Sequence, residues 1–216
     1  MKPLYHTLLI LLGWIFAANS SAQEMATWLR SMPEDLCPLL TQANKEELLT
    51  QYKEGVPSTV INRLGGNARL DTLSSDFLSL YPTASSSLEM HTVVIDDTTQ
   101  VIAIISSVMT PQRDSEFRCF DRSWHPSSAL RFIAPQAIDF YNNEATQMNI
   151  TKEGVVTEEE WRNHVIPYIV GYTFSSTAPD SIICSISIEH LPQEKAERLR
   201  TALRPSLTLP IIRNNQ

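Results

Sequence analysis

The stretch from Asp114 to His125 holds the densest group of potentially reactive side chains in the sequence. One interpretation makes Cys119 a nucleophile, with His125 as its base and Asp121 as the residue that orients the imidazole. The other makes Cys119 a core residue, because phenylalanines stand at 117 and 120 and a reactive cysteine needs exposed surroundings that lower its thiol pKa. The sequence favours the second interpretation, so no catalytic residue is predicted.

The same stretch supplies the candidates for binding a ligand, which are Asp114, Arg118, Asp121 and His125. Alternate side chains of a strand face opposite sides, so Glu116 and Arg118 would share one face while Cys119 and Asp121 share the other. The charged groups of this stretch are therefore not expected to converge on a single face.

Other chemistries lack their usual sequence patterns. The histidines at 91, 125, 164 and 190 are scattered and form neither H-x-x-x-H nor H-E-x-x-H, so no metal site is predicted. No G-x-S-x-G motif is present. Gly65-Gly66 indicates a turn, since no Lys-Ser/Thr pair follows it as in a phosphate-binding loop, and no cofactor is expected.

The first twenty-two residues have the pattern of an export signal. Lys2 supplies a positive start, Leu8 to Ala18 is an apolar run, and Ser20-Ser21-Ala22 offers small residues for cleavage before Gln23. A membrane anchor is the alternative, but the run is shorter than the roughly 20 residues that span a bilayer. Residues 1–22 are therefore predicted to be a signal peptide, and the mature chain to be periplasmic or secreted without a transmembrane segment.

Charge and cysteine content narrow the possible functions. The chain has 24 acidic and 17 basic side chains and a net charge of −7, which disfavours nucleic acid as a partner. Cys37, Cys119 and Cys184 are far apart and form no C-x-x-C motif. Either Cys119 and Cys184 form a bridge or all three are buried thiols, and their apolar surroundings favour buried thiols.

The spacing of apolar residues predicts helices near both ends of the mature chain and strands between them. Helices are expected at Met25–Ser31 and at Asn44–Lys53, with Asn44 as the cap of the second and Gly55 as its stop. Strands are expected at 68–73, 77–81, 88–95, 101–109 and 116–120, the last three as an antiparallel meander. The continuous apolar run around Ile104 indicates a strand that is buried on both faces.

The remainder of the chain predicts a capping box at Thr157–Glu160 that opens a helix, a hairpin of strands 168–174 and 182–188, and a helix at 193–203. The fold class is therefore α+β with mainly antiparallel sheet, amino-terminal helices, a central strand meander, and a carboxy-terminal hairpin plus helix. Residues 23–216 are expected to form a single domain, or alternatively two similar lobes at about 23–125 and 126–216.

Three motifs resemble those of one known family. They are Ser31-Met32-Pro33-Glu34-Asp35-Leu36-Cys37-Pro38-Leu39-Leu40, then Asn62-Arg63-Leu64-Gly65-Gly66 leading to Leu73-Ser74-Ser75-Asp76-Phe77, and finally Arg113 to Trp124. Their order and spacing are similar to the Bacteroidales family of exported proteins catalogued as domain of unknown function 3256. The likeness covers about Met32 to Trp124 and departs from the family in the helix around Asn44 to Tyr52.

The resemblance implies export in a Gram-negative bacterium and implies no activity. Short Asp-Ser/Thr-apolar sites at Thr72, Thr98 and Ser181 are similar to those that exported proteins of this group use for O-glycosylation.

Two functions follow as hypotheses. The first is an exported cell-envelope protein that binds an envelope protein or small ligand without catalysis, through its sheet or its amino-terminal helix. Trp28, Leu29 and Met32 form an apolar stripe on that helix, which is either a partner-binding face or core, and the sequence favours core. The alternative is a periplasmic hydrolase that acts on a peptide or glycan.

Overall fold

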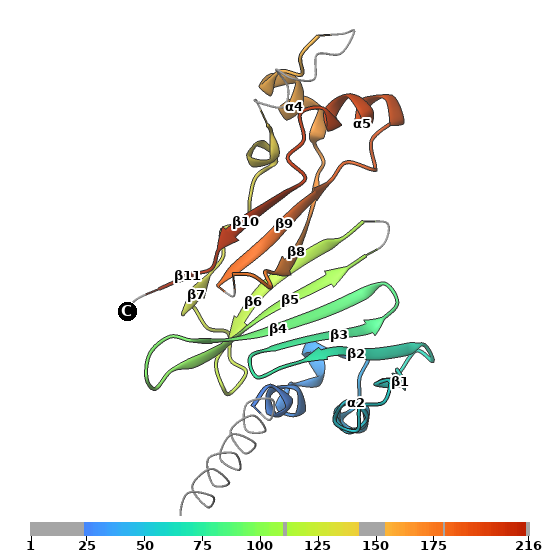
Figure 1. Ribbon diagram of the computed structural model, residues 1–216, viewed down its shortest axis with the longest axis vertical. Helices are drawn as coiled ribbons and strands as arrows, with labels where there is room; N and C mark the ends of the chain where they lie inside the picture. Colours follow the sequence, from blue (N-terminus) through green and yellow to red (C-terminus); the bar gives the residue numbers. More distant parts are fainter. Residues whose placement is uncertain (1–23, 110–111, 143–153, 179, 215–216) are drawn as a thin grey trace, which may run out of the picture. The chain divides into compact units, whose positions relative to one another are not determined.

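The β-branched middle of the chain forms a six-stranded sheet in the computed structural model, which describes residues 24–109, 112–142, 154–178 and 180–214. The strands lie in chain order, and the pairings of the first four are antiparallel (Figure 1). Their bounds are β1 (Thr59–Ile61), β2 (Asn67–Leu73), β3 (Phe77–Thr83), β4 (Ser86–Val94), β5 (Gln100–Val108) and β6 (Asp114–Phe120). The predicted meander is therefore confirmed, and the predicted signal segment lies outside the described residues.

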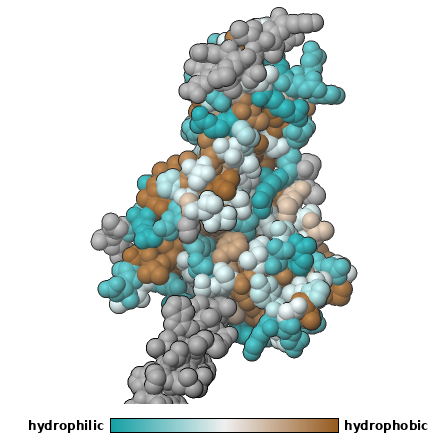
Figure 2. Space-filling view, viewed as in Figure 1, coloured by the Kyte–Doolittle hydropathy of each residue, from teal (hydrophilic) through white to brown (hydrophobic). Residues whose placement is uncertain are grey.

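The chain divides into two compact units. The first unit holds the described residues up to Ile104 together with Phe120–Ser127, and the second holds Ile105–Cys119 and the described residues from Ser128 onward. Among the described residues no helix is long and apolar enough to cross a membrane. On the face drawn in Figure 2, hydrophobic residues occur in separate groups among hydrophilic ones.

Helices of the first unit supply part of its core. Residues 24–31 are helical, and they are followed by η1 (Glu34–Leu36) and α2 (Gln42–Lys53). Leu29 and Leu48 from these helices join Leu80, Met90 and Ile104 of the sheet in one buried cluster. All residues from 101 to 105 are buried, which confirms that β5 is covered on both faces.

Helix α2 begins earlier than predicted because Thr41, and not Asn44, is its cap. The Thr41 hydroxyl accepts a hydrogen bond from the Asn44 backbone N–H at 3.1 Å, and the Asn44 side-chain oxygen accepts one from the Thr41 N–H at 3.0 Å. This reciprocal pair satisfies two of the backbone donors that every helix start leaves open. Gly55 follows the helix with a positive φ of 72°, as the predicted stop requires.

Strand β1 lies at one edge of the six-stranded sheet, and side chains of α2 cover its outer side. Gln51 Oε1 accepts a hydrogen bond from the Thr59 N–H at 2.7 Å, and Asn44 Nδ2 donates to the Ile61 carbonyl at 3.2 Å. Backbone groups that an edge strand would otherwise expose are thus satisfied within the same chain.

The second unit contains a three-stranded sheet in the order β10-β9-β8 and a two-stranded sheet of β11 and β7. Its helices carry Trp161, which is fully buried and donates through Nε1 to the Ala137 carbonyl at 2.8 Å. The predicted hairpin and the helix after it are present. The bounds are β7 (Leu130–Arg131), η2 (Ala137–Phe140), α4 (Glu158–Val165), β8 (Ile169–Phe174), β9 (Ser181–Ser187), α5 (Gln193–Arg200), β10 (Ser206–Pro210) and β11 (Ile212–Arg213).

Candidate functional site

The loop that follows β6 brings together two of the four predicted site residues. Asp121 Oδ1 accepts hydrogen bonds from the backbone N–H groups of Ser123 and His125, at 2.8 and 3.0 Å. The bond from His125, helped by that from Ser123, holds the pKa of the Asp121 carboxyl below its ordinary value. The imidazole Nδ1 of His125 lies 3.6 Å from Asp121 Oδ2, and its side chain is 78% exposed.

The other two predicted residues lie on β6, which is extended backbone. Arg118 lies 3.5 Å from Glu116 Oε2 and donates to the Ser106 hydroxyl at 3.4 Å. Asp114 begins the strand and is exposed. The structure therefore joins Asp121 to His125 but gives Arg118 different partners.

The geometry does not support Cys119 as a nucleophile. All three cysteines are buried and none forms a disulfide, which confirms the buried-thiol interpretation. Cys119 is 8% exposed and so lacks the access to substrate that a reactive cysteine needs. Within the described parts of the chain, no group of His, Cys, Asp or Glu residues could hold a metal ion.

A groove of about 260 Å³ opens in the first unit beside the helix at residues 24–31. Its lining residues are Glu24, Thr27, Trp28, Ser31 and Arg122. Positions 24, 27 and 31 share one helix face at i, i+3 and i+7, while the neighbouring face places Met25 and Leu29 in the core. The amphipathic pattern of the helix thus presents one row of polar side chains to the groove.

Trp124 fixes the loop against this helix. Its ring packs edge-on against Trp28 with centroids 5.3 Å apart, and its indole Nε1 donates to the Ser31 hydroxyl at 3.1 Å. Its backbone has a positive φ of 63°, a conformation that residues other than glycine rarely adopt. Such strain persists where the surrounding contacts over-determine it, and it often occurs at binding sites.

Arg122 supplies the positive charge of the groove. Its Nη2 donates to Glu24 Oε1 at 3.2 Å and also to Gln100 Oε1 at the start of β5. The side chain of Arg122 is 67% exposed and that of Glu24 is 43% exposed. The groove therefore places a largely exposed guanidinium beside the polar side chains of the helix and the edge of one indole ring.

Comparison with known proteins gives the family of the chain. The family model described as "Protein of unknown function (DUF3256)" matches residues 17–210. The chain belongs to this family. The resemblance seen in its motifs is thereby confirmed.

A solved structure shares the fold of this DUF3256 protein. It is a domain of an uncharacterized protein from Porphyromonas gingivalis W83, with a TM-score of 0.69 and 16% sequence identity over 89% of this chain and 98% of that one. At this identity the likeness shows the fold alone. No curated protein is significantly similar to the chain.

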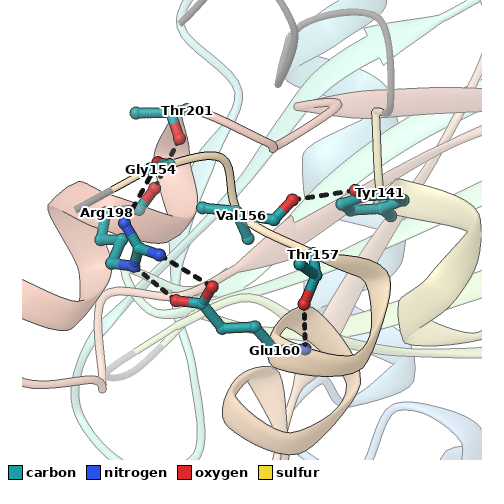
Figure 3. Close-up of polar contacts among 7 residues, drawn as sticks. All are labelled: Tyr141, Gly154, Val156, Thr157, Glu160, Arg198 and Thr201. Carbon is teal, nitrogen blue, oxygen red and sulfur yellow. Dashed lines mark hydrogen bonds and ion pairs between the residues drawn. The ribbon is translucent and has the colours of Figure 1, made fainter. Parts of the chain in front are cut away.

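The second unit of the DUF3256 protein has another groove, of about 330 Å³, between α4 and α5. Figure 3 shows the Glu160 carboxylate facing the Arg198 guanidinium there. Arg198 donates to Glu160 through Nε and Nη2, the latter at 2.9 Å, and through Nη1 to the Gly154 carbonyl at 3.5 Å. The side chain of Arg198 is 21% exposed within this pair, whereas that of Arg122 is 67% exposed, so the groove beside residues 24–31 is the better candidate site.

The predicted modification sites differ in accessibility. Thr98 is exposed in the turn between β4 and β5, where its hydroxyl donates to Asp96 Oδ1 at 2.8 Å. Thr72 and Ser181 lie within β2 and β9 and are only partly exposed. Glycosylation stays a prediction, with Thr98 the most accessible of the three positions.

Sequence reasoning missed Glu24, Thr27 and Arg122 as groove residues of this DUF3256 protein. Two signals pointed toward them. One is the polar row that begins at Glu24 beside the apolar stripe, and the other is the Asp121-Arg122-Ser123-Trp124 turn, where an aspartate accepts bonds from the backbone N–H groups that follow it.

Proposed function

We propose that this DUF3256 protein is an exported cell-envelope protein that binds a partner without catalysing a reaction, and that the groove beside residues 24–31 receives the partner. The observation that carries the proposal is the loop of Trp124, whose positive φ and indole bond to Ser31 hold Arg122 beside the polar face of the helix. Binding sites are concave and hold a few polar groups in fixed positions, and the contacts of Trp124 and Gln100 give Arg122 such a position in this groove.

Burial of Cys119 argues against the form of the hydrolase alternative in which Cys119 is the nucleophile. A cysteine hydrolase needs its thiolate, its base and the substrate in one accessible site. Here Cys119 is 8% exposed and packs within the protein.

A matched pair of substitutions tests the role of the groove. Thr27→Arg places a long side chain where the groove is lined, whereas Thr50→Arg makes the same change on the exposed face of α2. Both proteins and the parent would be expressed in the bacterium that carries the gene, cross-linked in intact cells and purified through a tag. We expect Thr27→Arg to lose a cross-linked partner that the parent and Thr50→Arg retain.

Equal recovery of every partner by the three proteins would show that the groove is not the binding surface. Circular dichroism and thermal unfolding of both variants establish that a loss does not come from misfolding.

The export part of the proposal has its own measurement. We expect the protein in the periplasmic or extracellular fraction, with an intact mass and amino-terminal sequence that begin at Gln23. Recovery of the full chain from Met1 in the cytoplasmic fraction would contradict export.

A further inference from the structure

We propose that the groove beside residues 24–31 recognises a carboxylate attached to a small apolar group, with Arg122 binding the carboxylate in place of Glu24 and Trp28 contacting the apolar part. This inference rests on the proposed binding function and names the chemical class of its ligand.

Arg122 is oriented by a partner outside the groove. Gln100 is not among the lining residues, yet its side-chain oxygen accepts a hydrogen bond from Arg122 Nη2. If Glu24 moves away, this amide still holds the guanidinium in place. A planar guanidinium that is held in this way is suited to a carboxylate, because its N–H groups match the two carboxylate oxygens.

In the structure, the Glu24 carboxylate occupies the place beside Arg122 that we assign to the ligand carboxylate. Its carboxylate oxygen lies 3.2 Å from Arg122 Nη2, and both side chains line the groove. Exposed ion pairs contribute little to stability, because water screens them and two long side chains must be ordered. A ligand carboxylate can therefore replace Glu24 at small cost and restore the same charge pairing.

The rest of the groove sets the size and polarity of the ligand. Its volume of about 260 Å³ is below the roughly 300 to 1,000 Å³ of sites for drug-sized molecules. Trp28 is 5% exposed, so only the edge of its ring forms the apolar floor of the groove, and Thr27 and Ser31 stand beside it on the same helix. A group the size of one amino acid with an unmodified α-carboxylate fits this combination, either as a free acylated amino acid or as the last residue of a peptide.

N-acetyl-L-leucine and N-acetyl-L-leucine amide are matched probes, because they differ in charge but hardly in shape. Binding would be followed by the NMR shifts of the indole N–H groups of Trp28 and Trp124 in the protein spanning Gln23 to Gln216. We expect the carboxylate probe to bind at least about tenfold more tightly than the amide, as a charge-assisted contact requires. Equal shifts from both probes, or none from the carboxylate at about 20 mM, would overturn the inference.

Three variants assign the contact to its residues. Arg122→Ala should abolish the preference for the carboxylate, and Glu24→Gln should tighten its binding by about three- to tenfold because the internal competitor loses its charge. Arg30→Ala is the control, since it breaks an ion pair of similar exposure, with Glu46, on the same helix but outside the groove. Unchanged selectivity in Arg122→Ala, or weaker binding in Glu24→Gln, would contradict the proposed exchange.

A peptide of four alanines and a terminal leucine separates the two sources of the carboxylate. Tighter binding of this peptide than of N-acetyl-leucine assigns the groove to peptide termini, and weaker binding assigns it to small acylated acids. If Thr27→Arg loses its cellular partner while neither carboxylate binds the parent protein, the inference fails and the proposed binding function stands.

Discussion

A Cβ atom at position 171 would lie 2.9 Å from Cγ and Cδ of Arg113, closer than real side chains approach. The absence of a side chain at Gly171 therefore leaves room for the aliphatic part of the Arg113 side chain to pass over β8 in the second unit. We expect Gly171→Ala to lower the free energy of unfolding by about 1 to 3 kcal/mol, because a methyl group is forced into a filled space. Urea denaturation would measure the loss.

The double variant Gly171→Ala with Arg113→Ala is the control for this prediction. Shortening the arginine vacates the space, so the double variant should be more stable than the sum of the two single losses predicts. Additive losses would show that the glycine is required for another reason.

Cys119 provides a second test at a single residue. We expect Cys119→Ala to lower the free energy of unfolding by about 1 to 3 kcal/mol through lost packing, while partner recovery is unchanged. Thermal unfolding and the cross-linking assay would measure the two quantities. Unchanged stability with lost function would instead support a chemical role for the thiol.

Helices α4 and α5 are joined by an ion pair that is mostly shielded from water. The side chains of Glu160 and Arg198 are 22% and 21% exposed, and hydrogen bonding by Arg198 is the main reason that the pKa of Glu160 lies below its ordinary value. A carboxyl with a lowered pKa in the folded state adds stability above its unfolded pKa, and this stability is lost as the pH falls through the folded pKa.

We expect Glu160→Gln to lower the free energy of unfolding by about 1.5 to 3 kcal/mol at pH 7 and to remove part of the acid sensitivity. Glu158→Gln is the control on the same helix, because its pair with Arg162 is more than half exposed and should contribute about 0 to 1 kcal/mol. Urea midpoints at pH 7 and pH 4 would measure both effects. Equal losses in the two variants would contradict the assigned role of burial.

Element positions were predictable where local patterns decide them. The stop at Gly55 and the strand around Ile104 follow from glycine conformation and from continuous apolar sequence. The start of α2 was wrong because Thr41 and Asn44 are both good caps and only their reciprocal bond shows which one stands outside the helix. Half of the predicted capping box at Thr157 forms, because the Glu160 carboxylate bonds to Arg198, a residue 38 positions away.

At the scale of the whole molecule, the candidate site depends on contacts between distant segments. Arg122 and Glu24 are 98 positions apart, and Trp124 reaches Ser31 across 93 positions. Periodicity identifies the apolar stripe at Trp28 but does not show which loop packs beside it. Asp114, Arg118, Asp121 and His125 were chosen because they are close in sequence, and of these only Asp121 and His125 bond to each other.

Alkaline pH should weaken the molecule through one thiol in each unit. Burial raises the pKa of Cys37 to about 11 and that of Cys184 to about 12, from an ordinary value of 9.0. A group with a raised folded pKa adds stability that is complete below the unfolded pKa and is lost as the pH rises from 9 toward the folded value. Lys45 acts in the opposite direction, since burial lowers its pKa and high pH relieves the cost of its charge.

Lys45 opposes Cys37 but does not affect Cys184, whose pKa is raised by burial alone, so we expect the urea midpoint to fall between pH 8 and pH 10.5. Each thiol contributes a loss of up to about 1.4 kcal/mol per pH unit. Cys184→Ala should make the urea midpoint depend less steeply on pH, whatever the effect of the substitution on stability at pH 8. A midpoint that rises with pH, or a slope that is unchanged in the variant, would contradict the prediction.

The covered edge of β1 has a consequence for behaviour at high concentration. Gln51→Ala leaves the Thr59 N–H without its acceptor, and exposed strand edges invite pairing with a second molecule. We expect light scattering to detect reversible self-association of Gln51→Ala at concentrations where the parent and the exposed control Gln42→Ala stay monodisperse. Such a result would show that Gln51 and Asn44 of α2 keep the protein monomeric by bonding to the backbone of the edge strand β1.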